Sequence, residues 1–403
     1  MNDVQLTDNA SRRIAQFDGL RALAFIAVFS HHALKIPLLW MGVDLFFVLS
    51  GFLITANLLR SADTCTVGSS IRVFFFRRLI RIAPPYFLTL ALVLAISLKS
   101  VPQGDIAWYV AFASNIRDVF WPALDGPLNS MWSVAVEEQF YLLWPLMVLF
   151  IPRRWLPLCF VALVPLAAGA RLVASGYGVD AVYRLMPCRM DLLAAGALLA
   201  WVDDRYPAAL RRFRFRLVVV AFLSLAVFAG LALSRSGFRT SKNTTEFNIL
   251  GFALLTLLFA SVIGAVRTLE RGLTLRFLNL RPLQWLGMVS YGCYLIHLLA
   301  LELVGRIIPG VVPRAAAGFV LTLLVAALSW RFIERPLQRL KNRVRFTRLG
   351  SYPASSRERS GMPQQVVATG TGEALRPSTC VSATFRPTRR PFSTTIPVGN
   401  RRS

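Results

Sequence analysis

Residues 17–59 read FDGLRALAFIAVFSHHALKIPLLWMGVDLFFVLSGFLITANLL, which is two apolar runs that carry ionisable groups. These groups include Asp18, Arg21, His31, His32 and Asp44. Because an ionisable side chain inside a bilayer is costly, each of them needs a structural or functional reason. A helix rises by about 1.5 Å per residue, so the step from Arg21 to His32 separates the two side chains by roughly 16 Å along one helix. That distance is about half the thickness of the hydrocarbon core of a bilayer.

The composition indicates an integral membrane protein. Of the 403 residues, 55% are hydrophobic and only 16% are charged, which is unlike an average water-soluble domain. Lysine and arginine number 45, against 20 aspartate and glutamate residues. The basic residues lie mostly in short loops and in the C-terminal tail, a placement typical of membrane topology signals. We therefore expect the lipid bilayer, and not a nucleic acid, as a partner.

Ten apolar runs are long enough to cross a bilayer as helices. They cover residues 17–36, 41–59, 83–101, 131–151, 156–174, 185–202, 217–234, 248–266, 283–303 and 314–333. If the N-terminus is cytoplasmic, most of the loop arginines fall on the cytoplasmic side, as the positive-inside rule requires. The predicted fold is an all-α integral membrane protein of about ten transmembrane helices, with both termini cytoplasmic.

Three other features complete the predicted organisation. Residues 106–120 are too short and polar to span, so we expect an interfacial or re-entrant segment there. Residues 1–340 form the transmembrane domain, and the basic, low-complexity tail over residues 341–403 is predicted to be disordered. The five cysteines show neither paired nor metal-binding spacing, so no disulfide framework and no metal site is expected.

Several ionisable groups converge on one level of the predicted membrane. The predicted topology places six of them in the outer half of the membrane: His32, Asp44, Glu137, Glu138, Asp191 and His297. Histidine exchanges a proton near neutral pH, and a carboxylate at hydrogen-bond distance orients it and stabilises its cation. We predict His32 as a catalytic base with Glu137 or Asp44 as its partner, and the sequence does not choose between the two. The other interpretation is that these groups are polar pairs that hold helices together.

A cluster of arginines lies at the opposite, cytoplasmic level. Arg77, Arg78 and Arg81 belong to the segment FFFRRLIRIAPPY, and Arg21 lies at the same end of the first helix. Arginine forks match phosphate oxygens, but arginines at this level also serve as topology anchors on anionic lipid. A nucleotide-bearing thioester donor would place its phosphates on these side chains and extend a long, thin arm toward His32.

Further polar and aromatic residues have two interpretations each. Trp132 and Tyr141, near the predicted outer boundary, are either interfacial anchors or platforms for stacking a sugar. Glu334 and Arg335, at the inner end of the last predicted helix, are either a capping ion pair or part of the donor site.

Seven segments, in this order along the chain, resemble the acyltransferase-3 family, which includes membrane-bound O-antigen and Nod-factor O-acetylases. They are FDGLRALA, GVDLFFVLSGFLI, FFFRRLIRIAPPY, MWSVAVEEQFYLLWP, RMDLLAAGALLAW, SYGCYLIH and FIERPL. The resemblance covers roughly residues 17–340 and includes the spacing of ten residues between Arg21 and His32.

The resemblance implies an enzyme that uses acyl-CoA, with acetyl-CoA as the expected donor co-substrate, and that holds no permanently bound cofactor. The implied acceptor is a hydroxyl of a carbohydrate or glycolipid, such as a surface polysaccharide or lipopolysaccharide, at the outer face of the bacterial inner membrane. His32 corresponds to the essential base, Arg21, Arg78 and Arg81 to donor-binding groups, and Glu137 to the acidic motif. The segment SYGCYLIH corresponds to a late helix motif of the family and contributes the site-lining residues Tyr291, Tyr294 and His297.

We therefore predict a membrane acyltransferase with three groups of site residues. The catalytic residues are His32, Glu137 and Asp44, and the donor-binding residues are Arg21, Arg77, Arg78 and Arg81. The substrate-binding residues are Glu138, Trp132, Tyr141, Asp191, Tyr291, Tyr294 and His297. The alternative is a proton-coupled transporter that uses the intramembrane histidines and acids as a relay. Against it, the sequence has no internal repeat of halves and no pair of broken helices.

Overall fold

The computed structural model describes residues 14–96, 102–121, 126–234 and 244–341. These residues form helices joined by short connections. The longer helices are α1 (Ala15–Leu34), α2 (Gly42–Thr64), α3 (Val67–Ile96), α6 (Met131–Phe150), α7 (Leu156–Ala174), α9 (Met190–Arg205), α11 (Arg214–Ser234), α13 (Phe252–Arg267), α15 (Arg281–Gly305) and α16 (Val311–Ser329). The shorter ones are α4 (Ile106–Val110), α5 (Ser114–Phe120), α8 (Val179–Arg184), α10 (Pro207–Arg212), α14 (Leu273–Leu278) and α17 (Arg335–Lys341). A π-helical turn over Trp330–Glu334 joins α16 to α17.

Eight helical segments of the described chain are long and apolar enough to cross a membrane. They contain α2, α3, α6, α7, α11, α13, α15 and α16. The two other predicted spans also form helices, α1 and α9. Helix α1 carries polar groups at both ends, and α9 has 16 residues, a length of about 24 Å that falls short of the hydrocarbon core. The all-helical membrane fold is therefore confirmed, whereas the count of ten and the orientation of the termini stay predictions.

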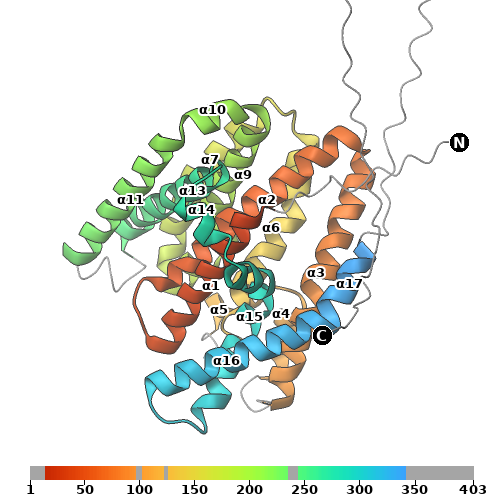
Figure 1. Cartoon of the computed structure of the whole chain (residues 1–403), viewed down its shortest axis with the longest axis vertical. Coiled ribbons are helices and arrows are strands. Elements are labelled where there is room, and N and C mark those ends of the chain that lie inside the picture. The colour runs from red at the N-terminus through yellow and green to blue at the C-terminus, as the bar shows by residue number, and fades with distance from the viewer. Residues whose placement is uncertain (1–13, 97–101, 122–125, 235–243, 342–403) are drawn as a thin grey trace, which may run out of the picture. The chain divides into compact units, whose positions relative to one another are not determined.

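Helices α1, α2 and α15 lie at the centre of the molecule, between α11 at one edge and α3 with α17 at the opposite edge (Figure 1). Helix α2 packs against α9, and α1 packs against α15. Close approach of α2 and α9 requires glycine, because a Cβ atom built on Gly51 would overlap the carbonyl of Leu193. The central helices are thus held in tight contact, which keeps the polar groups on their inner faces in place.

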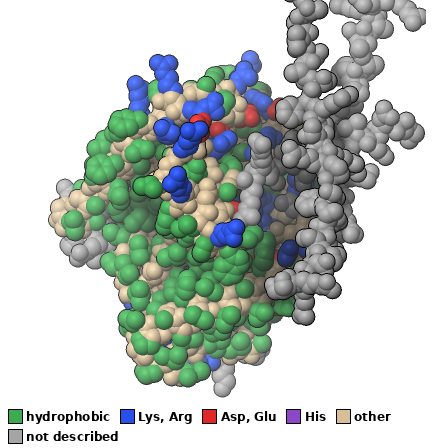
Figure 2. Space-filling view, viewed as in Figure 1, with side chains coloured by type: hydrophobic (Ala, Val, Ile, Leu, Met, Phe, Trp, Pro, Cys, Tyr) green, Lys and Arg blue, Asp and Glu red, His purple; other side chains and the backbone are tan. Residues whose placement is uncertain are grey.

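The surface separates charged from apolar residues. Lysine and arginine side chains gather at the end of the molecule that carries α10, whereas the visible surface at the other end is mostly hydrophobic (Figure 2). Large apolar side chains on spanning helices point outward, such as Leu166 on α7, Phe222 on α11 and Leu328 on α16. This pattern is typical of helices that face lipid.

The segment over residues 106–120 does not span. It forms α4 and α5, of five and seven residues, which are far too short to cross a bilayer. The predicted disordered tail over residues 341–403 lies outside the described residues, apart from Lys341 at the end of α17. The four described cysteines carry free thiols.

Candidate active site

A cavity of about 480 Å³ lies among α1, α2, α3, α6, α15 and the π-helical turn over Trp330–Glu334. Seven of the predicted site residues line it: Arg21, Arg78, Arg81, Glu137, Tyr141, Tyr291 and Tyr294. Segments that are far apart in the sequence therefore meet at one site. The lining also includes polar residues that we did not predict to be in the site, namely Asp18, Ser50, Asn57, Arg60, Ser133, Ser290 and Gln338. Glu334 lines it too, so the structure puts this residue beside the predicted donor-binding arginines.

The arginines of the cavity differ in their partners. Arg21 forms an ion pair with Asp18 at 2.9 Å, within the first turns of α1. The Arg78 guanidinium lies over the ring of Tyr141, at 4.9 Å from the ring centre. In the part of the chain that the structure describes, neither Arg78 nor Arg81 forms an ion pair with a carboxylate. Their guanidinium groups are therefore suited to an anionic ligand in the cavity. Arg77, the neighbour of Arg78, does not line the cavity.

Glu137 is the acidic residue of α6 that faces the cavity. Its two carboxylate oxygens accept hydrogen bonds from the Ser50 hydroxyl and the Tyr141 hydroxyl, both at 2.7 Å. Glu138 lies outside the lining, and its Oε1 is buried without a hydrogen-bond partner in the described residues. The sequence left open which of the two glutamates faces the site, and the geometry selects Glu137.

Two predicted site residues, His32 and His297, form a pair between α1 and α15. His297 Nε2 lies 3.3 Å from His32 Nδ1, and His297 Nδ1 lies 2.6 Å from the carbonyl of Tyr294. A carbonyl only accepts, so His297 Nδ1 carries the hydrogen and, in the neutral ring, its Nε2 accepts. His32 Nδ1 then donates, which agrees with its distance of 3.0 Å from the carbonyl of Val28. The contacts thus select the His32 tautomer that has its lone pair on Nε2.

The histidine pair lies next to the cavity without lining it. Tyr294 connects the two, because its ring lies 5.6 Å from the ring of His297 and its hydroxyl lies 2.7 Å from the Ser133 hydroxyl in the cavity wall. The depth argument assigned both histidines to one level, and the structure places their ring centres 5.1 Å apart. It did not identify His297 as the side chain that contacts His32.

Three other predicted site residues lie in the helix packing rather than in the cavity wall. Asp44 forms a fully buried ion pair with Arg189, which joins α2 to the start of α9. Asp191 forms a buried ion pair with Arg171 of α7, at 2.9 Å. Trp132 is buried against the ring of Tyr183, with 4.8 Å between ring centres. The two acids fit the interpretation of polar pairs that hold helices together, whereas Trp132 was predicted as an interfacial anchor or a sugar-stacking platform, and it lies buried between helices.

The partners of these acids were missed in the sequence, although a signal existed. Arg171 and Arg189 each lie inside a predicted apolar run, where an arginine is as costly as a carboxylate. Both guanidinium groups also lie 4.7 Å from the ring centre of Phe252. Pairing each intramembrane acid with an intramembrane base would have pointed to these contacts.

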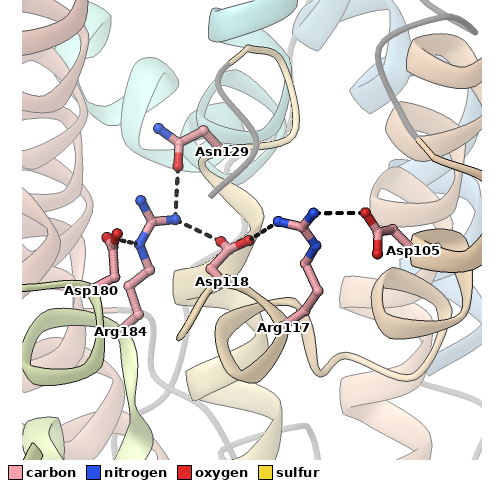
Figure 3. A network of polar contacts seen from close by, with 6 residues as sticks. All are labelled: Asp105, Arg117, Asp118, Asn129, Asp180 and Arg184. Carbon is pink, nitrogen blue, oxygen red and sulfur yellow. Dashed lines mark hydrogen bonds and ion pairs between the residues drawn. The ribbon is translucent and has the colours of Figure 1, made fainter. Parts of the chain in front are cut away.

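A chain of ion pairs lies beyond the start of α6 (Figure 3). Arg117 binds Asp105 at 2.7 Å and Asp118 at 3.3 Å, and Asp118 binds Arg184 at 2.7 Å. Arg184 also binds Asp180 at 2.7 Å and Asn129 at 2.8 Å. The network ties α5 and α8 to the residues that precede α6, the helix that carries Glu137.

The protonation of this network follows from its surroundings. Burial raises the pKa of Asp118, and the guanidinium groups of Arg184 and Arg117 only partly oppose that effect. Burial alone would lower the pKa of Arg117, but the hydrogen bond and charge of Asp105 raise it overall. The charge of Asp118 therefore depends on its two arginine partners.

Comparisons with known proteins give the site a context. The Acyltransferase domain model of the acyltransferase-3 family matches residues 14–331. The chain is 29% identical over 367 residues to the peptidoglycan O-acetyltransferase OatA of Listeria monocytogenes, covering 83% of this chain and 57% of that protein. It is 31% identical over 362 residues to the O-acetyltransferase OatA of Staphylococcus aureus, covering 81% of this chain and 58% of that protein.

These relatives are longer proteins, and the chain spans somewhat more than half of their length. No solved structure matches the chain. The family match covers the helices that build the cavity and the histidine pair, from α1 to the π-helical turn after α16. The chain therefore belongs to the acyltransferase-3 family.

Proposed function

We propose that the protein is an integral membrane O-acetyltransferase that transfers an acetyl group from acetyl-CoA to a hydroxyl of a cell-envelope glycan. Membership of the family supports acyl transfer, and it argues against the alternative of a proton-coupled transporter. The names of the relatives support a carbohydrate acceptor of the peptidoglycan type. The location in the bacterial cytoplasmic membrane, the ten helices and the cytoplasmic termini belong to the same proposal.

The observation that carries the proposal is the arrangement of charge in the cavity. Among the described residues, Arg78 and Arg81 form no ion pair with a carboxylate. Glu137 and three tyrosines line the same cavity, and the ring of one of these tyrosines, Tyr141, lies against the Arg78 guanidinium. Phosphate oxygens are the natural ligands of such guanidinium forks. The acetyl-CoA phosphates would bind near Arg21, Arg78 and Arg81, and the pantetheine arm would lead the thioester along α1 toward His32.

His32 would act as the general base through Nε2. In the neutral tautomer selected by Val28 and His297, this nitrogen holds the lone pair that accepts the proton of the acceptor hydroxyl. The hydroxyl oxygen attacks the thioester carbonyl, the carbon–sulfur bond breaks, and the departing CoA thiolate receives the proton from His32. His297 is a positioning residue in this scheme, and the products are the acetyl ester and CoA.

Purified protein in nanodiscs, supplied with radiolabelled acetyl-CoA and a soluble glycan fragment, tests the proposal. His32→Ala should lower kcat about 100-fold or more while the Kd for acetyl-CoA changes little, because a base contributes to the transition state rather than to donor binding. His31→Ala is the matched control, since His31 precedes it in the same helix and has its own contact with the carbonyl of Ile36. Unchanged turnover in His32→Ala would eliminate the assigned base.

A further inference from the structure

A second hollow, of about 780 Å³, lies on the outside of the protein between α15 and the end of α16. Its walls are apolar and include Trp285, Leu324, Ala327 and Leu328. Leu324 and Leu328 are 58% and 57% exposed, and both lie on α16, which belongs to a helical segment long and apolar enough to span a membrane. In a membrane this groove is filled by lipid chains, because water is excluded from such a surface.

Two arginines close one end of the groove. Arg331 and Arg335 both line it and are both exposed. They are four residues apart on a helical segment, so their charges lie near one another and repel. In the described part of the chain, neither forms an ion pair with a carboxylate. An anion between the two guanidinium groups would remove the repulsion and bind both.

The groove is separate from the central cavity. Met288 and Trp330 line both spaces, so these two side chains form the wall between them. Glu334 lines the cavity side of the π-helical turn, while Arg331 and Arg335 line the groove side. The segment after α16 therefore places an acid toward the cavity and two cations toward the lipid.

We propose that this groove binds an anionic phospholipid, with its acyl chains against Leu324, Ala327 and Leu328 and its phosphate between Arg331 and Arg335. The combination of an apolar groove open to the bilayer with paired cations at one end matches both parts of such a lipid. Because the lipid would pack behind Met288 and Trp330, it would also support the wall of the central cavity. The proposal does not depend on the reaction that the cavity carries out.

Native mass spectrometry of the full chain, released from nanodiscs of phosphatidylglycerol and phosphatidylcholine, tests this site. We expect the wild type to retain one phosphatidylglycerol molecule and to prefer it to phosphatidylcholine. Arg331→Gln with Arg335→Gln should weaken phosphatidylglycerol binding about 10- to 30-fold, because each cation near an anionic headgroup contributes separately. Ala327→Trp should also displace the lipid, by filling the groove without a change in charge.

The matched control is Arg211→Gln with Arg212→Gln, which removes two exposed cations of α10, far from the groove. It should leave phosphatidylglycerol retention unchanged. Equal retention of the two lipids by the wild type, or unchanged retention in the groove variants, would overturn the proposal. It would also be overturned if the groove variants kept phosphatidylglycerol but lost CoA binding in discs of phosphatidylcholine alone, because the cations would then serve the donor.

Discussion

Two groups of arginines in this protein differ in how their charge is balanced. Arg117 and Arg184 are buried in the network beside α6, where every guanidinium group binds at least two carboxylates. Arg78 and Arg81 face the central cavity and form no such pair among the described residues. A cation that is removed from water needs a partner, and for Arg117 and Arg184 the fold itself supplies the carboxylates. The second group retains its capacity to bind a ligand, and on that contrast we base the proposal that Arg78 and Arg81 bind the donor.

Removal of a network arginine is expected to have the largest effect on stability. Arg184→Met leaves Asp118 and Asp180 without their shared partner, and breaking a buried pair in this way costs about 3 kcal/mol of unfolding free energy. The loss should appear as a lower melting temperature in detergent. A variant as stable as the wild type would mean that the network does not hold α5 and α8 to the start of α6.

The pH dependence of this variant gives a second check. Asp118 already has a raised pKa, and the loss of Arg184 would raise it further, so the folded state of the variant binds a proton more readily than the unfolded chain. Stability should therefore increase as the pH falls through the raised pKa toward the ordinary pKa of an aspartate, and it should decrease as the pH rises through the same interval. We expect the melting temperature of Arg184→Met to lie closer to that of the wild type at pH 5 than at pH 8.

Removal of a cavity arginine is expected to change ligand binding rather than stability. Arg78→Ala should raise the Kd for acetyl-CoA about 10- to 100-fold, the range expected for the loss of a charge-assisted hydrogen bond, and leave the melting temperature near that of the wild type. Isothermal titration with acetyl-CoA measures the Kd, and differential scanning fluorimetry measures the melting temperature. Arg77→Ala is the matched control, because Arg77 precedes it in α3 but does not line the cavity. Equal loss of affinity for acetyl-CoA in both variants would mean that lining the cavity does not distinguish Arg78 from Arg77.

The smallest expected effect concerns the histidine pair, in which His297 sets the orientation of the His32 ring and does not balance a charge. His297→Gln can place an amide oxygen near the former Nε2 position and accept from His32, whereas the shorter side chain in His297→Asn cannot. We expect kcat to fall about fivefold more in the Asn variant, which corresponds to one hydrogen bond. The chain has only three histidines, so nitrogen NMR of 15N-histidine-labelled protein reads the tautomer of His32 directly. A His32 ring protonated on Nε2 would contradict the assigned tautomer.

Much of the membrane arrangement was predictable, because it depends on properties that are local in sequence. Apolar length indicated ten helices, of which eight belong to described segments long and apolar enough to cross a membrane, and polarity identified residues 106–120 as a segment too short to span. The spacing between Arg21 and His32 was interpreted as a distance along one helix, and both residues lie in α1. Depth in the membrane follows from residue count alone, and it brought His32 and His297 to the same level.

The choice of partner at a given depth was not predictable in the same way. Asp44, Glu137 and His297 were all assigned to the level of His32, yet Asp44 binds Arg189, Glu137 binds Ser50 and Tyr141, and His297 contacts His32. A sequence specifies how far along its axis a side chain lies, because the helical rise is constant. The direction in which that side chain points depends on how each helix is rotated against its neighbours.

The sequence by itself therefore determined the class of fold and the family resemblance, which follow from composition and motif. The membrane level that residue spacing assigns to each ionisable group stays a prediction. Only the tertiary structure decided which acids are neutralised by Arg171 and Arg189 and which polar groups line the cavity. The physical reason is that helix rotation and packing are set by contacts such as that of Gly51 with Leu193, between residues distant in sequence.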